Sequence, residues 1–410
     1  MIVNRSLFST LISLAFLLSV FQPGTTKSLA RENLVAFESI NFVTNIETIG
    51  IAVSGAGLPS TAGLSYRQSG EAVWRTGQPL VRIDDGRLIG SLFNLSPANS
   101  YEIKVLSGDA EISGSATTQP DQLSFTPAGT LYVDDDAPPG GDGSTTAPFQ
   151  TIQEAVNRAG PGTQVLVSDG IYREAVVFPQ SGTPGSWIQV KAAGSAVILD
   201  GADRLLGNIW TAASTGRVWY TKINGPVAYL ARDENRYYQY DDKTGLIQGI
   251  GHGKVSINEG WYYEPSTLRL YVRSLDSPAN HTWEVPRLNH AFDVAARDWI
   301  WIEGFEVRFY GTTTNGCGVC TLNASHLVIR GNQIHNMQLG IFVNWNGTST
   351  STQGNDTRIE GNDVSDPGIY GWPWAALKSS PMEGTGIIVR GHIGAIVRDN
   401  TVHSYFNGIY

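Results

Sequence analysis

Charged side chains are scarce in this sequence, and no basic run interrupts it. Asp, Glu, Lys and Arg make up only 16% of the 410 residues, with 28 basic against 37 acidic ones and a net charge of −9. Proteins that bind nucleic acid or anionic membranes need clustered positive charge, which this chain lacks. We therefore expect no nucleic-acid partner. The same charge would repel a polyuronate unless a local basic patch or a bound cation reversed it.

Cysteine is almost absent. The two cysteines, Cys317 and Cys320, lie in the segment C-G-V-C. In an oxidising compartment they could close a small disulfide ring. A redox motif of this spacing usually lies at a helix N-terminus, whereas these flanks are strand-like. A zinc site would need two further ligands, and only His326 and His335 are close in sequence. We favour a disulfide or two buried thiols over a redox or metal role.

Long hydrophobic runs are also missing, apart from one at the N-terminus. Leu7–Val20 is an apolar run of 14 residues, preceded by Arg5 and followed by Ser28-Leu29-Ala30. The run is shorter than the roughly 20 residues needed to cross a bilayer, and the small-x-small ending is typical of a cleavage site. We predict that residues 1–30 are a signal peptide rather than a membrane anchor. The mature chain would be secreted, extracellular or periplasmic, with no membrane insertion, and its net charge would be −11 because Arg5 and Lys27 are lost.

Glycine and aromatic residues are abundant, which favours a turn-rich all-β protein. The chain has 46 Gly, 11 Trp, 16 Tyr and 14 Phe, and residues 31–118 show period-two alternation with turn residues between the runs. This pattern predicts an antiparallel β-sandwich of seven short strands. Leu95–Tyr101 resembles the tyrosine corner of fibronectin type III domains, with Trp74 as the expected core tryptophan. Residues 119–130 form the expected linker.

The segment after the linker has a strand, a turn, a short helix and another strand. Thr151 and Glu154 form a capping box for the helix. The segment resembles the first coil of pectate-lyase-like right-handed β-helix proteins. The stretches that carry this resemblance are Leu131–Asp136, Gly140–Gly143, Ala147–Val156, Pro161–Val167, Asp169–Glu174, Ile188–Ala193 and Val197–Gly201. It implies a right-handed parallel β-helix (β-solenoid) over residues 131–410, with a helix-capped first coil and an insertion at about 205–290.

A repeat in the last third of the sequence supports stacked coils. Gly-Val or Gly-Ile pairs begin at residues 318, 340, 386 and 408, so that two intervals of 22 residues flank one of 46. Between them, three asparagines are expected to stack as an internal ladder. Four charged residues are expected to form a surface column of ion pairs. The asparagines are Asn332, Asn362 and Asn400, and the column is Glu303, Arg330, Glu360 and Arg398. Because the sequence stops at Tyr410 within a Gly-Ile strand, we expect the C-terminus to be truncated.

The strand after each Gly-Ile pair is the candidate ligand face. If Val319, Ile341, Ile387 and Ile409 point inward, then Cys320, Phe342, Ile388 and Tyr410 point outward, as do Asn344 and Arg390 two positions further on. Two polar insertions, 344–355 and 363–383, border this face. Tryptophan faces stack on sugar rings, and amides bind hydroxyls. We predict substrate binding by Phe342, Asn344, Trp345, Trp372 and Trp374; Trp372 and Trp374 could equally plug their loop onto the coil beneath.

The resemblance and this face together favour an exported polysaccharide lyase. Such an enzyme needs a base, and cations that stabilise the substrate carboxylate. We predict Lys378 as the base and Arg390 as the carboxylate clamp. Asp363, Asp366 and Glu383 are the predicted ligands of a possible Ca²⁺ ion. The expected partner is an acidic polysaccharide cleaved by β-elimination, and the expected state is a monomer. Motifs of glycoside hydrolases and uronan epimerases are absent. The alternative is a non-catalytic surface module that binds glycan or protein.

Overall fold

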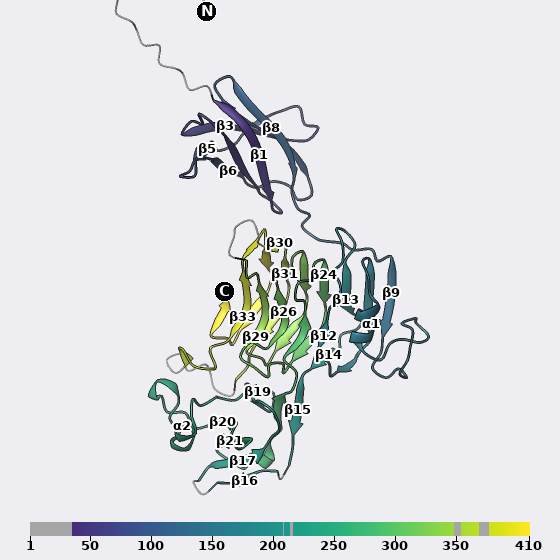
Figure 1. The fold of residues 1–410 in the computed structure, drawn as a ribbon, viewed down its shortest axis with the longest axis vertical. Helices are drawn as coiled ribbons and strands as arrows, with labels where there is room; N and C mark the ends of the chain where they lie inside the picture. The colour runs from purple at the N-terminus through teal and green to yellow at the C-terminus, as the bar shows by residue number, and fades with distance from the viewer. Residues whose placement is uncertain (1–34, 208, 214–215, 348–353, 369–376) are drawn as a thin grey trace, which may run out of the picture. The chain divides into compact units, whose positions relative to one another are not determined.

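The computed structural model describes residues 35–207, 209–213, 216–347, 354–368 and 377–410, which form two compact units that divide after Gln119 (Figure 1). The expected signal peptide lies outside these residues. None of the described helices is both long and apolar enough to cross a membrane. The predicted all-β class is confirmed, because the regular structure is mainly strands and the helices are short.

The N-terminal unit is an antiparallel β-sheet structure of eight strands. In hydrogen-bonding order they run β1-β2-β6-β5-β3-β7-β8, with β4 beside β3, and β1 also packs against β8. Their bounds are β1 (Ala36–Thr44), β2 (Ile49–Ala56), β3 (Thr61–Gln68), β4 (Arg75–Thr76), β5 (Leu80–Arg82), β6 (Leu88–Leu92), β7 (Ser100–Ser107) and β8 (Ala110–Thr117). Ile49, Ile51 and Val53 are buried in the core at alternate positions, as period two requires.

Two aromatic residues of this unit test the predictions made from the sequence. The Tyr101 hydroxyl accepts a hydrogen bond of 2.8 Å from the Ser96 amide, which is the contact of a tyrosine corner. The prediction for Trp74 is wrong. Its ring is half-buried and lies outside the core, with the Arg67 guanidinium 4.7 Å from the ring centre. Trp74 lies in an irregular segment, so no strand alternation turns its side chain inward.

The C-terminal unit is built from three parallel sheets that the chain visits in turn. The first contains β9 (Gly129–Val133), β10 (Thr163–Val167), β13 (Ile188–Ala192), β24 (Ile300–Glu303), β27 (Leu327–Arg330), β31 (Arg358–Glu360) and β35 (Ile396–Arg398). The second contains β11 (Gly170–Tyr172), β14 (Val197–Asp200), β25 (Glu306–Arg308), β28 (Gln333–His335), β32 (Asp363–Ser365) and β36 (Thr401–His403). The third contains β12 (Val176–Val177), β23 (His290–Asp293), β26 (Cys317–Leu322), β29 (Leu339–Asn344), β33 (Thr385–Arg390) and β37 (Asn407–Ile409). From β10 onward each coil therefore adds one strand to every sheet, whereas β9 has no counterpart in the second and third sheets. An apolar core fills the space between the sheets.

A short helix covers the first coil. Helix α1 (Ile152–Arg158) begins at the predicted capping box, in which the Thr151 side chain accepts from the Glu154 amide and the Glu154 carboxylate accepts from the Thr151 amide. Ile152 and Val156 are buried against β9, β10 and β12. The capping helix inferred from the sequence is confirmed in these contacts.

The glycine of each Gly-Val or Gly-Ile pair marks a bend in the third sheet. A Cβ atom on Gly318 would lie 2.7 Å from Ile334 Cγ2 and 3.1 Å from Met337 Sδ, two atoms of the core. The next residue, Val319, is also buried in the core. Two consecutive positions thus point inward, which happens only where the regular alternation of a strand is interrupted. Glycine is needed because the core has no room for a side chain there.

The predicted asparagine ladder is present. Asn362 Oδ1 accepts from the backbone and side-chain amides of Asn332, and Asn400 Oδ1 accepts in the same way from Asn362, all at 2.9–3.0 Å. The predicted column forms in part: Glu360 binds Arg330 at 2.7 Å and Arg398 at 3.1 Å, whereas Glu303 pairs with Lys191 at 3.1 Å. Glu360 is buried, so these pairs do not form the surface column that was expected. Because the coils stack, residues at equivalent positions of successive coils lie next to one another.

The insertion forms a small subdomain between β14 and β23. Its core contains Trp261 and Trp283, both fully buried. Its elements are β15 (Ala202–Leu205), β16 (Thr211–Ala212), β17 (Val218–Lys222), β18 (Ala231–Arg232), β19 (Asn235–Arg236), α2 (Lys243–Gln248), β20 (Gly260–Glu264), β21 (Arg269–Arg273) and β22 (Trp283–Pro286). The subdomain contacts the coils after β32, where the Arg236 amide donates to the Pro367 carbonyl.

Candidate functional site

A cavity of about 340 Å³ lies on the outer face of the third sheet, over β23, β26 and β29. This volume is at the lower end of the range for small-molecule sites, roughly 300–1,000 Å³. It is lined by His290, Asp293, Ala295, Asn315, Cys320, Thr321, Leu322, Phe342, Asn344 and Asn346.

The bend at each glycine pair explains why these side chains face outward. Ile341 is fully buried, so the next residue, Phe342, points to the opposite face and lines the cavity. Asn344, two positions further on, lines it as well. The predicted outward direction of Cys320, Phe342 and Asn344 is confirmed, because all three line the cavity.

The asparagines on this face are held by one another. Asn344 Nδ2 donates to Asn346 Oδ1 at 2.7 Å, and the Asn346 amide donates to Asn323 Oδ1 at 2.9 Å. The first bond orients the two side-chain amides against each other, and the second holds the backbone of Asn346. Side-chain amides of this kind can bind hydroxyl groups.

The electrostatic character of the cavity is close to neutral. None of its lining residues is Lys or Arg, and Asp293 is the single carboxylate among them. Burial lowers the pKa of His290, which keeps the imidazole uncharged near neutral pH. The cavity therefore has no local positive field that would attract a carboxylate.

Two other predicted residues lie beside the cavity. Arg390 on β33 is the register partner of Asn344 and is exposed. Trp345 is half-buried and packs edge-on against His392, with ring centres 6.4 Å apart. Neither residue lines the cavity. Trp372 and Trp374 lie outside the described residues.

The structure does not bring the predicted base and clamp together. Lys378 is 73% exposed and lies 3.6 Å from Glu383, before the start of β33, whereas Arg390 is the last residue of that strand. Five strand steps of about 3.3 Å separate Thr385 from Arg390, or roughly 16 Å. Lys378 therefore precedes β33 and Arg390 ends it, and their roles as base and carboxylate clamp stay predictions.

The predicted calcium ligands are also separate. Asp363 faces His403 at 3.7 Å, and Glu383 accepts from the Ser379 amide at 2.7 Å. Asp366 is fully buried, where its carboxylate accepts from the Tyr229 hydroxyl at 2.6 Å and lies 3.2 Å from Arg236 Nε. The three acids form no common cluster. The prediction is wrong because Asp366 anchors the inserted subdomain, a contact that sequence spacing does not indicate.

Among the described residues, two groups gather enough potential ligands for a metal ion. One is the run Asp134–Asp136, in which Asp134 accepts from the Asp136 backbone amide and Asp135 accepts from the Ile171 amide of strand β11. The other joins His290 to the two cysteines. Cys317 and Cys320 are linked as a disulfide, as one of the sequence interpretations expected, and a disulfide offers no thiolate.

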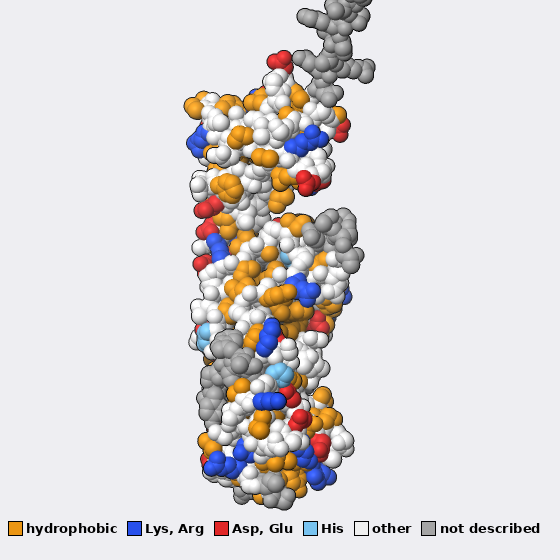
Figure 2. All heavy atoms as spheres, turned by 90° about the vertical axis from the view of Figure 1, so that its left-hand side faces the viewer, with side chains coloured by type: hydrophobic (Ala, Val, Ile, Leu, Met, Phe, Trp, Pro, Cys, Tyr) orange, Lys and Arg blue, Asp and Glu red, His pale blue; other side chains and the backbone are white. Residues whose placement is uncertain are grey.

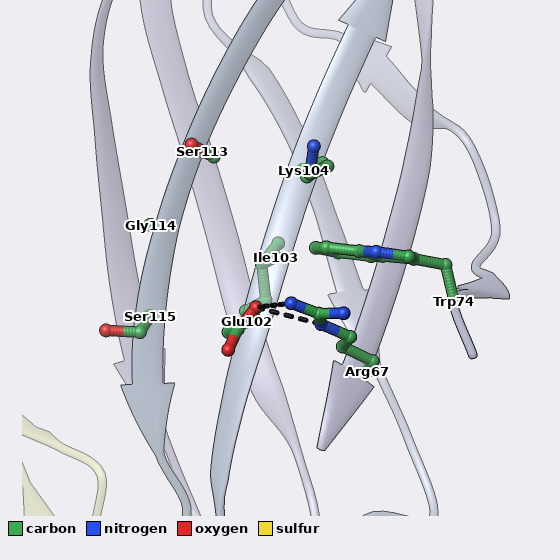
Figure 3. Close-up of a pocket in the computed structure, with 8 residues that line it drawn as sticks. All are labelled: Arg67, Trp74, Glu102, Ile103, Lys104, Ser113, Gly114 and Ser115. Atoms are coloured by element: carbon green, nitrogen blue, oxygen red, sulfur yellow. Dashed lines mark hydrogen bonds and ion pairs between the residues drawn. The ribbon is translucent and has the colours of Figure 1, made fainter. Parts of the chain in front are cut away.

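Further cavities lie outside the coils, and two of them contain aromatic rings. The first is on the N-terminal unit, where the Trp74 ring lies between Arg67 and Lys104 (Figure 3). Since cations cover both faces of this ring, a sugar cannot stack on it. The second is on the insertion, where Tyr220 and Tyr271 carry Arg269 and Lys243 over their rings.

Apolar side chains are also exposed on the last described coils. Ile393 is 40% exposed and Tyr410 is 70% exposed. In the space-filling view, hydrophobic side chains gather over the coiled region with basic side chains among them (Figure 2).

His290, Asp293 and Asn315 were missed in the sequence. His290 and Asp293 lie in β23, directly after the irregular insertion, and Asn315 lies in the turn before β26, outside the repeated Gly-Ile pattern. The available signal was the apolar pair Ala291-Phe292, in which alanine stands where the next strands of the third sheet have glycine.

Comparison with known proteins gives distant similarity to solved structures. The structure described as the complex of XylC with xylose has 15% identity and a TM-score of 0.45, over 68% of this chain and 59% of that one. Pectate lyase Pel9A has 14% identity and a TM-score of 0.34, over 66% and 48%. A rhamnogalacturonan lyase has 12% identity and a TM-score of 0.29, over 69% and 62%. The chain thus spans less than two thirds of each of these structures. No family model and no curated protein match the sequence.

Proposed function

We propose that this chain is an exported carbohydrate-active protein, in which a right-handed parallel β-helix binds a polysaccharide across its third sheet. The observation that carries the proposal is the cavity over β23, β26 and β29, where Phe342 lies beside Asn344 and Asn346. The right-handed winding is inferred from the strong preference of parallel crossover connections for that hand.

The lining supports a sugar better than other ligands. A sugar ring has apolar C–H faces that stack on an aromatic ring, and hydroxyls around its edge that bind amides. The cavity has both features and little charge. Its size fits one or two sugar units, and the parallel strands continue the same face to both sides of it, as a polymer requires.

Binding can be tested with a panel of neutral and acidic oligosaccharides. Replacing Phe342 with Ala should weaken binding about tenfold, since one stacking contact is worth roughly 1–1.5 kcal/mol. The matched control is Phe93→Ala, which removes an exposed phenylalanine of the N-terminal unit. If no oligosaccharide binds, or if both variants bind like the parent protein, the cavity is not a sugar site.

A second candidate is β-elimination on an acidic polysaccharide. The exposed Arg390 favours it, because this side chain lies next to Asn344 and could bind a uronate carboxylate beyond the rim of the cavity. Elimination also needs cations that stabilise the substrate carboxylate, and the cavity lining offers neither lysine nor arginine, although His290 could serve as the base. Binding alone is therefore the function that the geometry supports best.

The two candidates differ in product formation. A lyase releases an unsaturated sugar that absorbs ultraviolet light, and Arg390→Ala should lower the rate on polyuronates while leaving neutral-sugar binding unchanged. Binding without product on every polyuronate, with or without Ca²⁺, would select the non-catalytic module.

A further inference from the structure

The two cysteines lie on the same outer face of the third sheet. In a regular strand, residues three apart point to opposite faces. Gly318 and Val319 both turn inward between them, so the Cα atoms of Cys317 and Cys320 come within 5.7 Å of each other. Cys317 is completely buried, whereas Cys320 is 8% exposed and lines the cavity. One sulfur of the disulfide can therefore be reached from solvent.

His290 lies next to this disulfide. It is the register partner of Cys317 on the adjacent strand β23, and its Nδ1 atom is 2.7 Å from Cys320 Sγ and 3.7 Å from Cys317 Sγ. Sulfur is a weak acceptor, so the chemical role of this contact depends on which ring nitrogen carries the proton.

The hydrogen bonds around Asn289 settle the tautomer. Asn289 Oδ1 accepts from the Thr313 backbone amide at 3.1 Å, so the other atom of the side-chain amide is Nδ2, a donor. That nitrogen lies 2.9 Å from His290 Nε2, which must therefore be the acceptor. A neutral imidazole that accepts at Nε2 carries its proton on Nδ1. The Nδ1–H group consequently points at Cys320 Sγ.

We propose that the Cys317–Cys320 disulfide is a thiol–disulfide exchange site, reached from the cavity at Cys320, in which His290 stabilises the Cys320 thiolate. The substrate class is a small thiol or dithiol. In a cysteine pair of this spacing, N–H donors of a helix N-terminus commonly stabilise the thiolate. On this strand a single imidazole N–H of His290 is the donor instead. The proposal goes beyond sugar binding and does not depend on it.

A dithiol reduces the Cys317–Cys320 disulfide in two steps. One reagent thiolate attacks Cys320 Sγ, the disulfide bond breaks, and its electron pair leaves on Cys317 Sγ, which takes a proton from water. The second reagent thiolate then attacks the reagent sulfur of the mixed disulfide. This step closes a cyclic disulfide and releases the Cys320 thiolate to the His290 N–H group. The net result is one protein thiol at Cys317, one thiolate at Cys320 and one oxidised dithiol, with the second proton of the dithiol released to solvent.

A bound metal ion is the competing interpretation. An ion held by both sulfurs and His290 would need a lone pair on Nδ1, with the proton on Nε2. That tautomer would point an N–H at the Asn289 donor, so the observed contacts favour exchange.

The test uses the full chain and two single-cysteine variants. Cys317→Ser leaves the accessible Cys320, and Cys320→Ser is the matched control that leaves the buried Cys317. Alkylation should be at least about tenfold faster at Cys320, and its pH profile should show a pKa below the ordinary value for cysteine of about 8.5. Adding His290→Gln to Cys317→Ser should raise that pKa, whereas adding His392→Gln, a half-buried histidine without a sulfur contact, should not.

The oxidised parent protein completes the test. Dithiothreitol should reduce the disulfide while circular dichroism shows an unchanged fold. In Cys317→Ser, glutathione disulfide should form a mixed disulfide at Cys320 and release one molecule of reduced glutathione. A disulfide that resists reduction until the protein unfolds would overturn the proposal. So would faster labelling of Cys317, an unchanged profile in the His290→Gln variant, or a zinc or copper ion held by both cysteines in the purified protein.

Discussion

Replacing Asn362 with Ala should destabilise the coiled unit by roughly 4 kcal/mol. The Asn362 side chain accepts from the Asn332 backbone amide at 3.0 Å and donates to the Ile329 carbonyl at 2.9 Å. Both backbone groups lie inside the stack, and alanine offers neither a partner. Each buried group that loses its hydrogen bond costs about 1–3 kcal/mol, which gives a total of about 2–6 kcal/mol.

The measurement is urea unfolding of the full chain, followed by tryptophan fluorescence. The variant should shift the midpoint of the transition assigned to the coiled unit with little change in its slope. Asp363→Ala is the matched control, because this exposed neighbour is the first residue of β32 and its replacement should cost no more than about 0.5 kcal/mol. A cost below about 1 kcal/mol for Asn362→Ala would show that water or relaxation of the coils replaces the ladder, and would refute the reasoning.

Three further predictions concern packing, pH and charge. Gly340→Ala should lower the free energy of unfolding by about 1–3 kcal/mol, because the new Cβ would overlap Val364 Cγ1 and a backbone carbonyl in the core. Gly408→Ala is the control, since its Cβ would meet nothing within 4 Å, and the urea midpoints of the two variants are compared. Burial raises the pKa of Asp366 to about 7, so the folded state retains a proton that the unfolded chain loses above about pH 4. The stability that this proton contributes should therefore fall as pH rises from about 4 to 7 and stay constant above that, and Asp366→Asn should abolish this part of the fall. Glu360→Gln should lower the free energy of unfolding by about 2 kcal/mol, because it removes the carboxylate shared by three arginines. High salt should not restore the lost stability, because Glu360 is buried.

The features that the sequence predicted correctly are local or repeated. The capping box of Thr151 and Glu154 depends on residues three apart, and it forms the expected contacts. The glycine pairs and the asparagines recur with each coil, so their periodicity reveals that they stack. The outward direction of Phe342 and Asn344 followed from the same period.

The errors concern contacts between segments that are far apart in the sequence. Asp366 was assigned to a metal, but it binds Tyr229, a partner 137 residues away in the insertion. Its neighbours in sequence give no sign of that contact. His290 was overlooked for a related reason, because the irregular insertion ends where its strand begins. Trp74 was placed in the core on family resemblance, although its own segment lacks strand alternation.

The position of the insertion explains why ligand binding is expected at one end of the third sheet. Arg236 contacts the turn after β32, and Leu377, shortly before β33, packs with Tyr238 and Tyr240 of the insertion. The insertion therefore occupies the side from which the chain enters the third sheet. The cavity lies toward the opposite ends of β26 and β29, where Leu322 and Asn344 are the last strand residues. The acidic Asp366, which lies against the insertion, forms a buried ion pair with Arg236. A search for groups that contact a polysaccharide should therefore concentrate on the strand ends beyond the cavity, where Arg390 is exposed.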